Sequence, residues 1–209
     1  MKALRFLAIL LLFIPFACSE GDDGVAGDAT GEPDVEQVNT FTPIEGGPDC
    51  QFDEELRGKD VGDHIKNFSL KKPDDTFYWM HEACGYGKKV VWMILATGHC
   101  GTCENYAPAV EQVYQQYKDQ GLEVVWVLGA TKDYAPPTLA QLEEFVQSKN
   151  VTFPVLRDYN FYQVYDAIDR VGTGLPHIYV LDATTMELIH KQDGPGDPAE
   201  SLVIEMLTN

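Results

Sequence analysis

The sequence predicts an α/β fold, a three-layer α/β/α sandwich in which helices cover both faces of a mixed central sheet. Three observations favour this fold class. A continuous apolar run at 90–95 and a second run at 122–128, apolar except for Glu123, are typical of strands that are buried on both faces of a sheet. A segment with helical spacing of apolar residues follows each run, and strands that are separated by a helix pair in parallel. Two more strand-like segments, at 177–181 and 187–190, are separated only by a turn, which predicts an antiparallel pair.

The first half of the domain is expected to alternate between strands and helices. Strand 90–95 reads VVWMIL, and the helix over 103–120 has an apolar stripe and is followed by a glycine that suits a helix C-terminus. Strand 122–128 reads LEVVWVL. The amphipathic helix over 138–149 begins after two consecutive prolines that interrupt the chain.

The elements of the second half are shorter. Strand 153–156 precedes a helix over 160–168, whose apolar residues fall on one face. The hairpin strands at 177–181 and 187–190 come next, and a helix over 198–207 closes the domain.

Charge and composition exclude several classes of protein. The 209 residues include 33 acidic and 15 basic side chains, and this net charge of −18 argues against nucleic acid or an anionic membrane surface as a partner. Hydrophobic residues make up 44% of the chain, as in a globular protein and unlike a disordered one. No apolar run reaches the roughly 18–20 residues of a membrane-spanning helix. A soluble enzyme or a binding module remains.

Residues 1–17 have the pattern of a secretory signal peptide, with a short basic start and an uncharged apolar run that is too short to span a bilayer. Cys18 resembles the lipidated cysteine of a bacterial lipobox, although Pro15 and Phe16 depart from that pattern. Lipidation would anchor the protein to a membrane without spanning it. The alternatives are ordinary cleavage to a soluble secreted protein and, for residues 1–17, a buried N-terminal helix.

An acidic segment follows Cys18. Residues 19–49 hold nine acids, no Lys or Arg, six Gly and three Pro, so they cannot bury enough apolar surface to offset the entropy of ordering. We therefore expect a signal peptide over 1–17, a flexible acidic tether over 18–49 and a single domain over 50–209.

The motif Cys100-Gly101-Thr102-Cys103 carries the chemistry, because it follows a buried strand and opens a helix. Unpaired backbone N–H groups and the positive end of the helix dipole favour thiolate over thiol at such a position. The second cysteine lies one turn later, close enough to attack a mixed disulfide on the first. Half of a zinc site has the same spacing, so the motif alone leaves a metal site open.

Several segments resemble the TlpA-like and redoxin branch of the thioredoxin superfamily. In chain order they are 61–70, 93–103 with Pro108, 153–158, and 174–176 with the apolar strand and Leu181-Asp182 that follow. The resemblance implies a thioredoxin-like fold and thiol–disulfide exchange that needs no cofactor and no metal. It implies Cys100 as the exposed nucleophile and Cys103 as the buried resolving thiol. It also implies Pro176 as a cis-proline that leaves the Leu175 backbone free to align a substrate.

The same resemblance, together with the signal peptide, implies a protein of the bacterial cell envelope that faces the periplasm as a lipid-anchored monomer. Its partners would be protein disulfides or dithiols and an upstream membrane electron donor or acceptor, with no nucleic acid. The direction of electron flow stays open, because reduction potentials in the superfamily span roughly −270 to −120 mV.

The residues around the motif depart from the family pattern. His99 stands where a Trp is common, and it either stabilises the thiolate of the nucleophile or faces the solvent with little effect. Thr102 replaces a common Pro. The positions where relatives place a buried acid are Ile94 and Tyr106 here, and Glu104 is expected to point to the solvent.

Two cysteines remain, Cys50 and Cys84. In an oxidising compartment two spare cysteines usually pair, so we expect a structural disulfide that fastens residues 50–57 to the domain. The alternative is that Cys84 is a further resolving or reactive thiol.

Three other functions stay open. A zinc or copper-delivery site would use Cys100, Cys103, His99 and His177. A thiol peroxidase is suggested by Thr97, which precedes the first cysteine of the motif by three residues as in peroxiredoxins. The third is a non-catalytic binding lipoprotein that has kept the fold.

Overall fold

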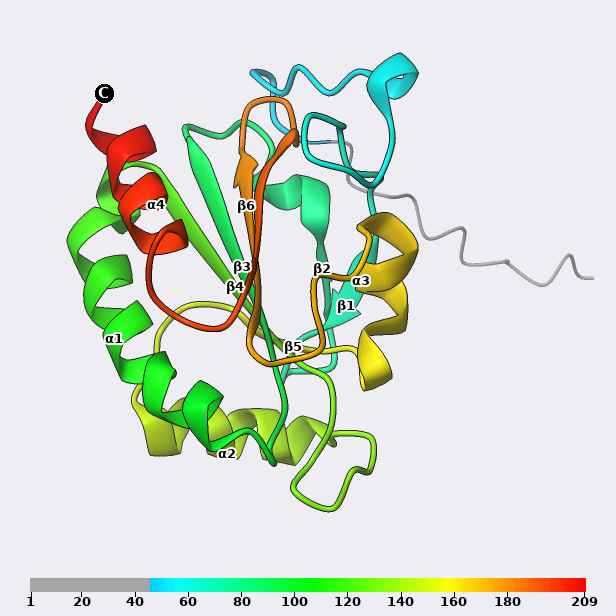
Figure 1. Ribbon diagram of the computed structural model, residues 1–209, viewed down its shortest axis with the longest axis vertical. Coiled ribbons are helices and arrows are strands. Elements are labelled where there is room, and N and C mark those ends of the chain that lie inside the picture. The colour runs from blue at the N-terminus through cyan, green and yellow to red at the C-terminus, as the bar shows by residue number, and fades with distance from the viewer. Residues whose placement is uncertain (1–45) are drawn as a thin grey trace, which may run out of the picture. The chain divides into compact units, whose positions relative to one another are not determined.

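The computed structural model describes residues 46–209, which form a seven-stranded sheet with helices on both faces (Figure 1). The strands are β1 (Ser69–Lys71), β2 (Phe77–Trp79), β3 (Val90–Ala96), β4 (Leu122–Leu128), β5 (Val155–Arg157), β6 (His177–Asp182) and β7 (Leu188–Asp193). The helices are α1 (Gly101–Tyr117), α2 (Leu139–Lys149), α3 (Tyr162–Ala167) and α4 (Ala199–Thr208). Short 3-10 turns form η1 (Glu54–Leu56), η2 (Met80–Ala83), η3 (Lys118–Gln120) and η4 (Tyr159–Phe161).

The sheet is mixed, with the strand order β2-β1-β5-β4-β3-β6-β7. Strand β3 pairs in parallel with β4 along its whole length, and β4 pairs in parallel with β5. Strand β6 runs antiparallel to both of its neighbours, β3 and β7. The predicted three-layer sandwich with parallel pairing first and a hairpin last is therefore confirmed.

Two hydrophobic clusters lie on opposite faces of this sheet. One cluster includes residues of α1, α2 and α4, and the other includes α3 and the turn η2. All seven side chains of β3 and all seven of β4 are buried, because both faces of these central strands are covered. The burial explains why their sequences are almost entirely apolar instead of alternating; the one charged residue, Glu123 on β4, pairs with Lys88 at 2.6 Å.

Several element boundaries differ from the predictions: β7 continues to Asp193, three residues beyond its predicted end, and three other differences have a clear local cause. Helix α1 begins at Gly101, two residues early, and its last predicted turn is the 3-10 turn η3, which ends at Gly121 with φ +107°. The helix expected over 160–168 is broken, because Asn160 and Phe161 are left-handed, with φ +53° and +58°. Strand β5 begins at Val155, after Pro154, which lacks the N–H that a ladder needs.

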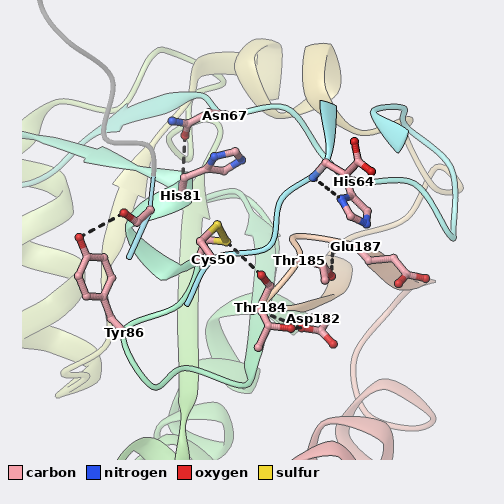
Figure 2. The surroundings of a disulfide bond; sticks show 12 residues. Cys50, His64, Asn67, His81, Tyr86, Asp182, Thr184, Thr185 and Glu187 are labelled. Carbon is pink, nitrogen blue, oxygen red and sulfur yellow. Dashed lines mark hydrogen bonds between the residues drawn. A yellow bond between two sulfur atoms is a disulfide. The ribbon is translucent and has the colours of Figure 1, made fainter. Parts of the chain in front are cut away.

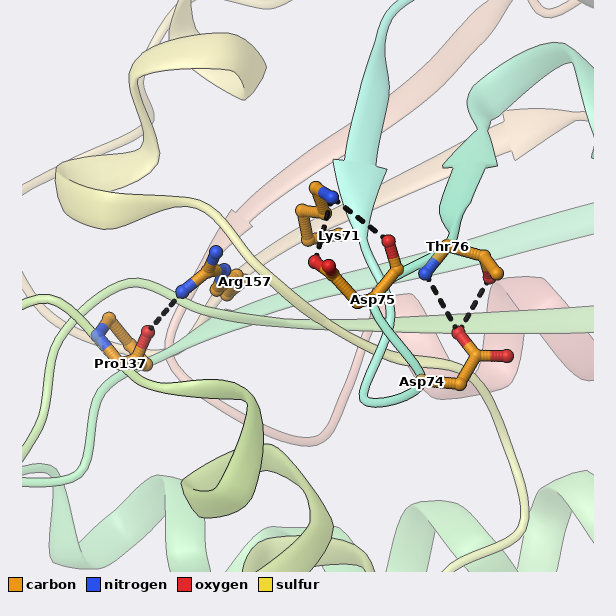
Figure 3. A network of polar contacts seen from close by, with 6 residues as sticks. All are labelled: Lys71, Asp74, Asp75, Thr76, Pro137 and Arg157. Carbon is orange, nitrogen blue, oxygen red and sulfur yellow. Dashed lines mark hydrogen bonds and ion pairs between the residues drawn. The ribbon is translucent and has the colours of Figure 1, made fainter. Parts of the chain in front are cut away.

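The hairpin of β1 and β2 at one edge of the sheet was not predicted. Its strands have three residues each, too few for a period of two to be visible in the sequence. Figure 3 shows its turn, where Asp74 accepts hydrogen bonds from the N–H and the hydroxyl of Thr76, at 3.1 and 2.6 Å. Lys71 pairs with Asp75 at 2.7 Å across the same turn.

The segment before the domain core is attached to it from Gly46 onward. The N–H of Gly47 donates to the carbonyl oxygen of Cys84 at 2.8 Å, and that of Gln51 donates to Thr184 at 2.6 Å. The expected signal peptide over 1–17, the lipidation of Cys18 and most of the expected tether lie outside the described residues. No helix among residues 46–209 is long and apolar enough to cross a membrane.

Candidate active site

The dithiol motif lies at the junction of β3 and α1, beyond the carboxyl end of the central strand. Cys100 has an extended backbone and is the N-cap of α1. The N–H of Cys103 donates to the sulfur of Cys100 at 3.1 Å. This sulfur therefore receives a hydrogen bond from one of the N–H groups that a helix N-terminus leaves unpaired, in the position where a thiolate is most stabilised.

The two cysteines of the motif are bonded to each other and differ in exposure. Their Cα atoms are 5.3 Å apart in the disulfide. Cys103 is 1% exposed and packs in the cluster beneath α1, whereas Cys100 is only half-buried at the rim of that cluster. An external sulfur atom can therefore approach Cys100 but not Cys103, which is the arrangement expected for a nucleophile and a resolving thiol.

The segment before β6 supplies the second wall of the site. The peptide bond between Leu175 and Pro176 is cis, the isomer that the resemblance implies for this position. Asp193, at the end of β7, accepts hydrogen bonds from the N–H groups of Thr173 and Gly174 at 3.1 and 3.2 Å. The carboxylate thus holds the proline loop in place, a role that the sequence did not reveal because Asp193 is distant from the loop along the chain.

His99 is exposed, and its ring is not free. The ring stacks on Tyr134, with centroids 4.2 Å apart and planes 28° apart. Its Nδ1 lies 3.3 Å from the carbonyl oxygen of Thr131, and a carbonyl can only accept, so Nδ1 carries the proton of this contact. Both partners belong to the loop between β4 and α2, whose approach to the motif was not predicted.

Glu104 does not point to the solvent as expected. Its side chain is 29% exposed and pairs with Lys149 at 3.4 Å and with Lys132 at 3.7 Å. It lines, together with Cys103, a cavity of about 500 Å³ between the start of α1, the β4–α2 loop and α2. The carboxylate thus contacts Lys149 of α2. The spacing of apolar residues in the α1 sequence could not predict this contact with another helix.

The two positions at which a buried acid was considered carry none. Ile94 is fully buried on β3. Burial raises the pKa of Tyr106 to about 12, so its hydroxyl keeps its proton at neutral pH and cannot accept that of a thiol. Glu104 shares a cavity with Cys103, and Asp133 and Glu144 also line this cavity.

His177 belongs to a different cluster. It is buried beside α3, where the hydroxyl of Tyr165 lies 2.8 Å from Nδ1. Burial raises the pKa of Tyr165 to about 12 and lowers that of His177, so the protonated phenol donates to a neutral imidazole. His177 and Cys103 thus point to opposite faces of the sheet, and the four residues of the metal alternative are not brought together. Within residues 46–209, no group of three potential ligands could hold a metal ion.

The buried hydroxyl of Thr97, the residue behind the peroxidase alternative, has no hydrogen-bond partner among residues 46–209. Thr97 is buried, and its carbonyl oxygen accepts the N–H of Cys100 at 3.1 Å. Two arginines of the domain bind elsewhere: Arg157 donates to the carbonyl oxygen of Pro137, and Arg170 lies over the ring of Tyr165.

A second disulfide joins Cys50 and Cys84, as the cysteine count suggests (Figure 2). Cys84 is fully buried, and its sulfur lies 3.5 Å from the carbonyl oxygen of Thr184. Next to the bond, the ring of Phe52 packs between His64 and His81, at centroid distances of 5.9 and 4.6 Å. This bond lies near the amino end of β3, at the opposite end of the strand from the dithiol motif.

Comparisons with known proteins agree with this geometry. Residues 61–187, more than half of the chain, match the AhpC/TSA family. No curated protein has a significant sequence match to the chain.

Many solved structures share the fold. They include the thioredoxin domain of a thiol-disulfide oxidoreductase from Bacteroides vulgatus, with a TM-score of 0.58 and 14% identity over 72% of this chain and 100% of that one. A Bacteroides thetaiotaomicron protein assigned as a protein disulfide isomerase has a TM-score of 0.59 and 17% identity over 72% and 92%. A Chlorobium tepidum protein assigned as the thiol:disulfide interchange protein DsbE has a TM-score of 0.55 and 18% identity over 72% and 96%. The fold is thioredoxin-like.

Proposed function

The chain belongs to the AhpC/TSA family, and from this premise we propose that it is a thiol–disulfide oxidoreductase that exchanges electrons through Cys100 and Cys103. One observation carries the proposal. The sulfur of Cys100 is accessible and accepts the N–H of Cys103 at the tip of α1, while the second sulfur is buried within bonding distance. Such exchange requires at least two thiols, one that reacts with the partner and one that then forms the intramolecular disulfide.

The reaction proceeds in two displacements. The Cys100 thiolate attacks one sulfur of a partner's cystine, the cystine bond breaks, and the second partner sulfur leaves with the electron pair and takes up a proton. Cys103 then loses its proton and attacks the Cys100 sulfur of the mixed disulfide, and the first partner sulfur leaves as a thiolate, which also takes up a proton. The partner has gained two electrons and two protons, and the protein holds the Cys100–Cys103 disulfide. The reverse sequence oxidises a partner dithiol.

The removal of the proton from Cys103 is the step for which the site supplies the fewest groups. We assign Glu104 and the cavity that it shares with Cys103 as the path by which this proton leaves, since Tyr106 cannot accept it. Lys149 and Lys132 hold this carboxylate at the cavity, with N–O distances of 3.4 and 3.7 Å.

Serine substitution of each cysteine tests the proposal. Cys100→Ser should abolish insulin reduction by the protein, whereas Cys103→Ser should accumulate mixed disulfides that can be identified by mass spectrometry of unreduced samples. Full turnover by the Cys100→Ser protein, or peroxide consumption that exceeds disulfide exchange, would overturn the assignment. The reduction potential of the couple, measured against glutathione, decides the direction of electron flow.

We further propose that the protein acts in the bacterial cell envelope as a monomer, anchored through lipid on Cys18, and exchanges electrons with a membrane donor or acceptor. The support is the sequence pattern of residues 1–18 and the expected pairing of two cysteines outside the motif, which is typical of oxidising compartments. A Cys18→Ala protein should leave the membrane fraction and lose the mass of the acyl chains. Retention in that fraction would argue against lipid anchoring.

A further inference from the structure

A row of exposed rings leads away from Cys100 across the surface. It consists of His99, Tyr134, Tyr159 and Tyr162, which we call the aromatic strip. His99 stacks on Tyr134 at 4.2 Å, and the hydroxyl of Tyr159 donates to the carbonyl oxygen of Tyr134 at 3.4 Å. The ring of Tyr159 meets that of Tyr162 edge to face, with centroids 6.5 Å apart. Each member thus contacts the next, and the first one is the neighbour of the nucleophile in sequence.

The exposure of the strip is unusual within the domain. Among residues 46–209, six large apolar or tyrosine side chains are exposed, and three of them belong to the strip: Tyr134 at 69%, Tyr159 at 38% and Tyr162 at 67%. Tyr134 also has φ +61°, a left-handed conformation that favours Gly or Asn. A tyrosine at such a position, with most of its ring in solvent, adds little to packing, so its use is to be sought outside the fold.

The backbone beneath the strip is firmly held. In the β4–α2 loop, the N–H of Thr131 donates to Ala135 at 2.9 Å, and the N–H of Tyr134 donates to Thr131 at 3.2 Å. Arg157 on β5 donates to the carbonyl oxygen of Pro137 at 3.1 Å, as Figure 3 shows. Rings on a fixed backbone bind a partner with less loss of entropy than rings on a mobile loop.

Two contacts tie this loop to the turn that carries Tyr159 and Tyr162. The N–H of Asn160 donates to the carbonyl oxygen of Gly129 at 2.9 Å. The ring of Phe161 lies so close to Gly129 that a Cβ atom at that position would overlap it. The two segments of the strip therefore form one platform.

The strip lies on one side of Cys100, and the proline loop lies on the other. Strand β3, which leads to Cys100, is flanked in the sheet by β4 and β6. The loop after β4 carries Tyr134, and the loop before β6 carries Leu175 and Pro176. Farther along the strip, a cavity of about 250 Å³ is lined by Tyr159 with Pro136, Pro137 and Phe77. Two cations also line it, Lys71, which pairs with Asp75, and Arg157, which donates to the carbonyl oxygen of Pro137. A chain that crosses Cys100 from the proline loop would continue onto the aromatic strip.

We propose that the aromatic strip is the docking surface for the partner protein, and that it receives a segment with Lys or Arg side chains beside the cysteine that reacts with Cys100. The inference rests on the proposed function, because only a partner that bonds to Cys100 must lie over the adjacent surface. The chemistry of the occupant follows from ring faces and charge. Tyrosine faces attract ammonium and guanidinium groups, and the chain has a net charge of −18. Within the loop, Asp133 is exposed, while the ammonium group of Lys132 is paired with Glu104.

Peptide disulfides that differ only beside the cysteine test this proposal. The reduced protein is mixed with symmetric peptide disulfides whose cysteine is flanked by Lys, Ala or Glu, and with hydroxyethyl disulfide as a partner that lacks flanks. We expect rate constants in the order Lys, Ala, Glu, with about tenfold between the extremes at low salt and less at high salt. The double variant Tyr134→Ala/Tyr162→Ala should lower the ratio of the Lys-peptide rate to the hydroxyethyl disulfide rate by about tenfold.

Tyr86 provides a matched control. It is also an exposed tyrosine, at 59%, with a left-handed backbone at φ +52°, but it follows Cys84 near the other end of β3. Tyr86→Ala should leave all rates unchanged. Equal ratios in the double variant and the wild type, or faster reaction with Glu flanks, would overturn the docking proposal alone. A wild-type protein that reduces none of the four disulfides would instead overturn the proposed function.

Discussion

The two disulfides lie near opposite ends of strand β3. They are the same kind of bond, but their surroundings differ. Cys100 and Cys103 are three residues apart, and one of their sulfurs is accessible at the tip of α1. Cys50 and Cys84 are 34 residues apart, and Cys84 is fully buried beside Thr184. One bond closes a single helical turn, whereas the other fastens a separate segment to the domain.

The contrast shows that the surroundings of each disulfide, and not the chemistry of cysteine, decide which bond can exchange with a partner and which one stabilises the fold. Each region has an exposed tyrosine with positive φ, a buried histidine and a carboxylate that caps backbone N–H groups. At the motif the accompanying sulfur, that of Cys100, is accessible, and the buried histidine, His177, lies on the opposite face of the sheet. At the other end they lie near a bond in which Cys84 is fully buried and Cys50 is half-buried (Figure 2).

Reduction by a small dithiol should separate the two bonds most strongly. The dithiol attacks the accessible sulfur of Cys100, and Cys103 leaves first. Cys100 then leaves as a thiolate that is stabilised by the N–H of Cys103, when the reagent closes its own disulfide, whereas attack on buried Cys84 is obstructed. We expect Cys50–Cys84 to be reduced at least about a hundredfold more slowly, as measured by timed alkylation and peptide mass spectrometry. Reduction of both bonds at one rate would remove the functional distinction between them.

Removal of each bond should have unequal effects on stability. By the chain-entropy estimate, replacing Cys50 and Cys84 by Ala lowers the free energy of unfolding by about 4 kcal/mol, because the closed loop is long. The corresponding change at Cys100 and Cys103 removes a short loop and should cost about 2 kcal/mol.

Urea unfolding of the oxidised proteins measures both values. The Cys50/Cys84 variant should also keep wild-type exchange at a temperature where it is folded. A larger loss of stability at the motif than at Cys50–Cys84 would contradict the structural role of the latter.

Substitution of the two carboxylates that cap backbone N–H groups, Asp193 and Asp182, should also have different effects in the two regions. Asp193 holds the N–H groups of Thr173 and Gly174, so Asp193→Ala should loosen the proline loop and slow exchange about threefold to fivefold. Asp182 accepts the N–H of Thr184 at 2.7 Å beside the buried disulfide. Asp182→Ala should lower stability by about 1 kcal/mol and leave exchange rates intact. The opposite pairing of effects would show that the proline loop does not depend on Asp193.

The smallest expected effect concerns pH. Burial lowers the pKa of both His81, near Cys84, and His177, beside the proline loop. Both imidazoles are therefore neutral in the folded protein, while the unfolded chain takes up their protons below about pH 6.5. Their contribution to stability is complete above that value and is lost as the pH falls from it toward the lower folded pKa.

Urea midpoints between about pH 7.5 and about pH 5 should fall, and less steeply in either His81→Gln or His177→Gln. A slope that is identical in wild type and both variants would assign the acid sensitivity to other groups.

Periodicity and motif spacing predicted the centre of the molecule better than its rim. The runs at β3 and β4 are unambiguous because strands covered on both faces leave few polar positions, here Glu123 alone. The dithiol could be placed because a helix tip after a buried strand needs no distant partner. By contrast, the contact of His99 with Tyr134, the inward turn of Glu104 and the grip of Asp193 on the proline loop all join segments that are far apart in the chain. Such contacts depend on loop conformations that a pattern of apolar residues does not encode, and the three-residue strands of the β1–β2 hairpin are too short to carry a pattern.

The missing side chain at Gly129 has an evolutionary consequence. Since the ring of Phe161 occupies the space that a Cβ atom would need, mutation at either site is constrained by the other. Relatives with a bulkier residue at the first site should have a smaller one at the second. Anyone who grafts Tyr134 onto a different scaffold would have to transplant both strand-following loops as a unit.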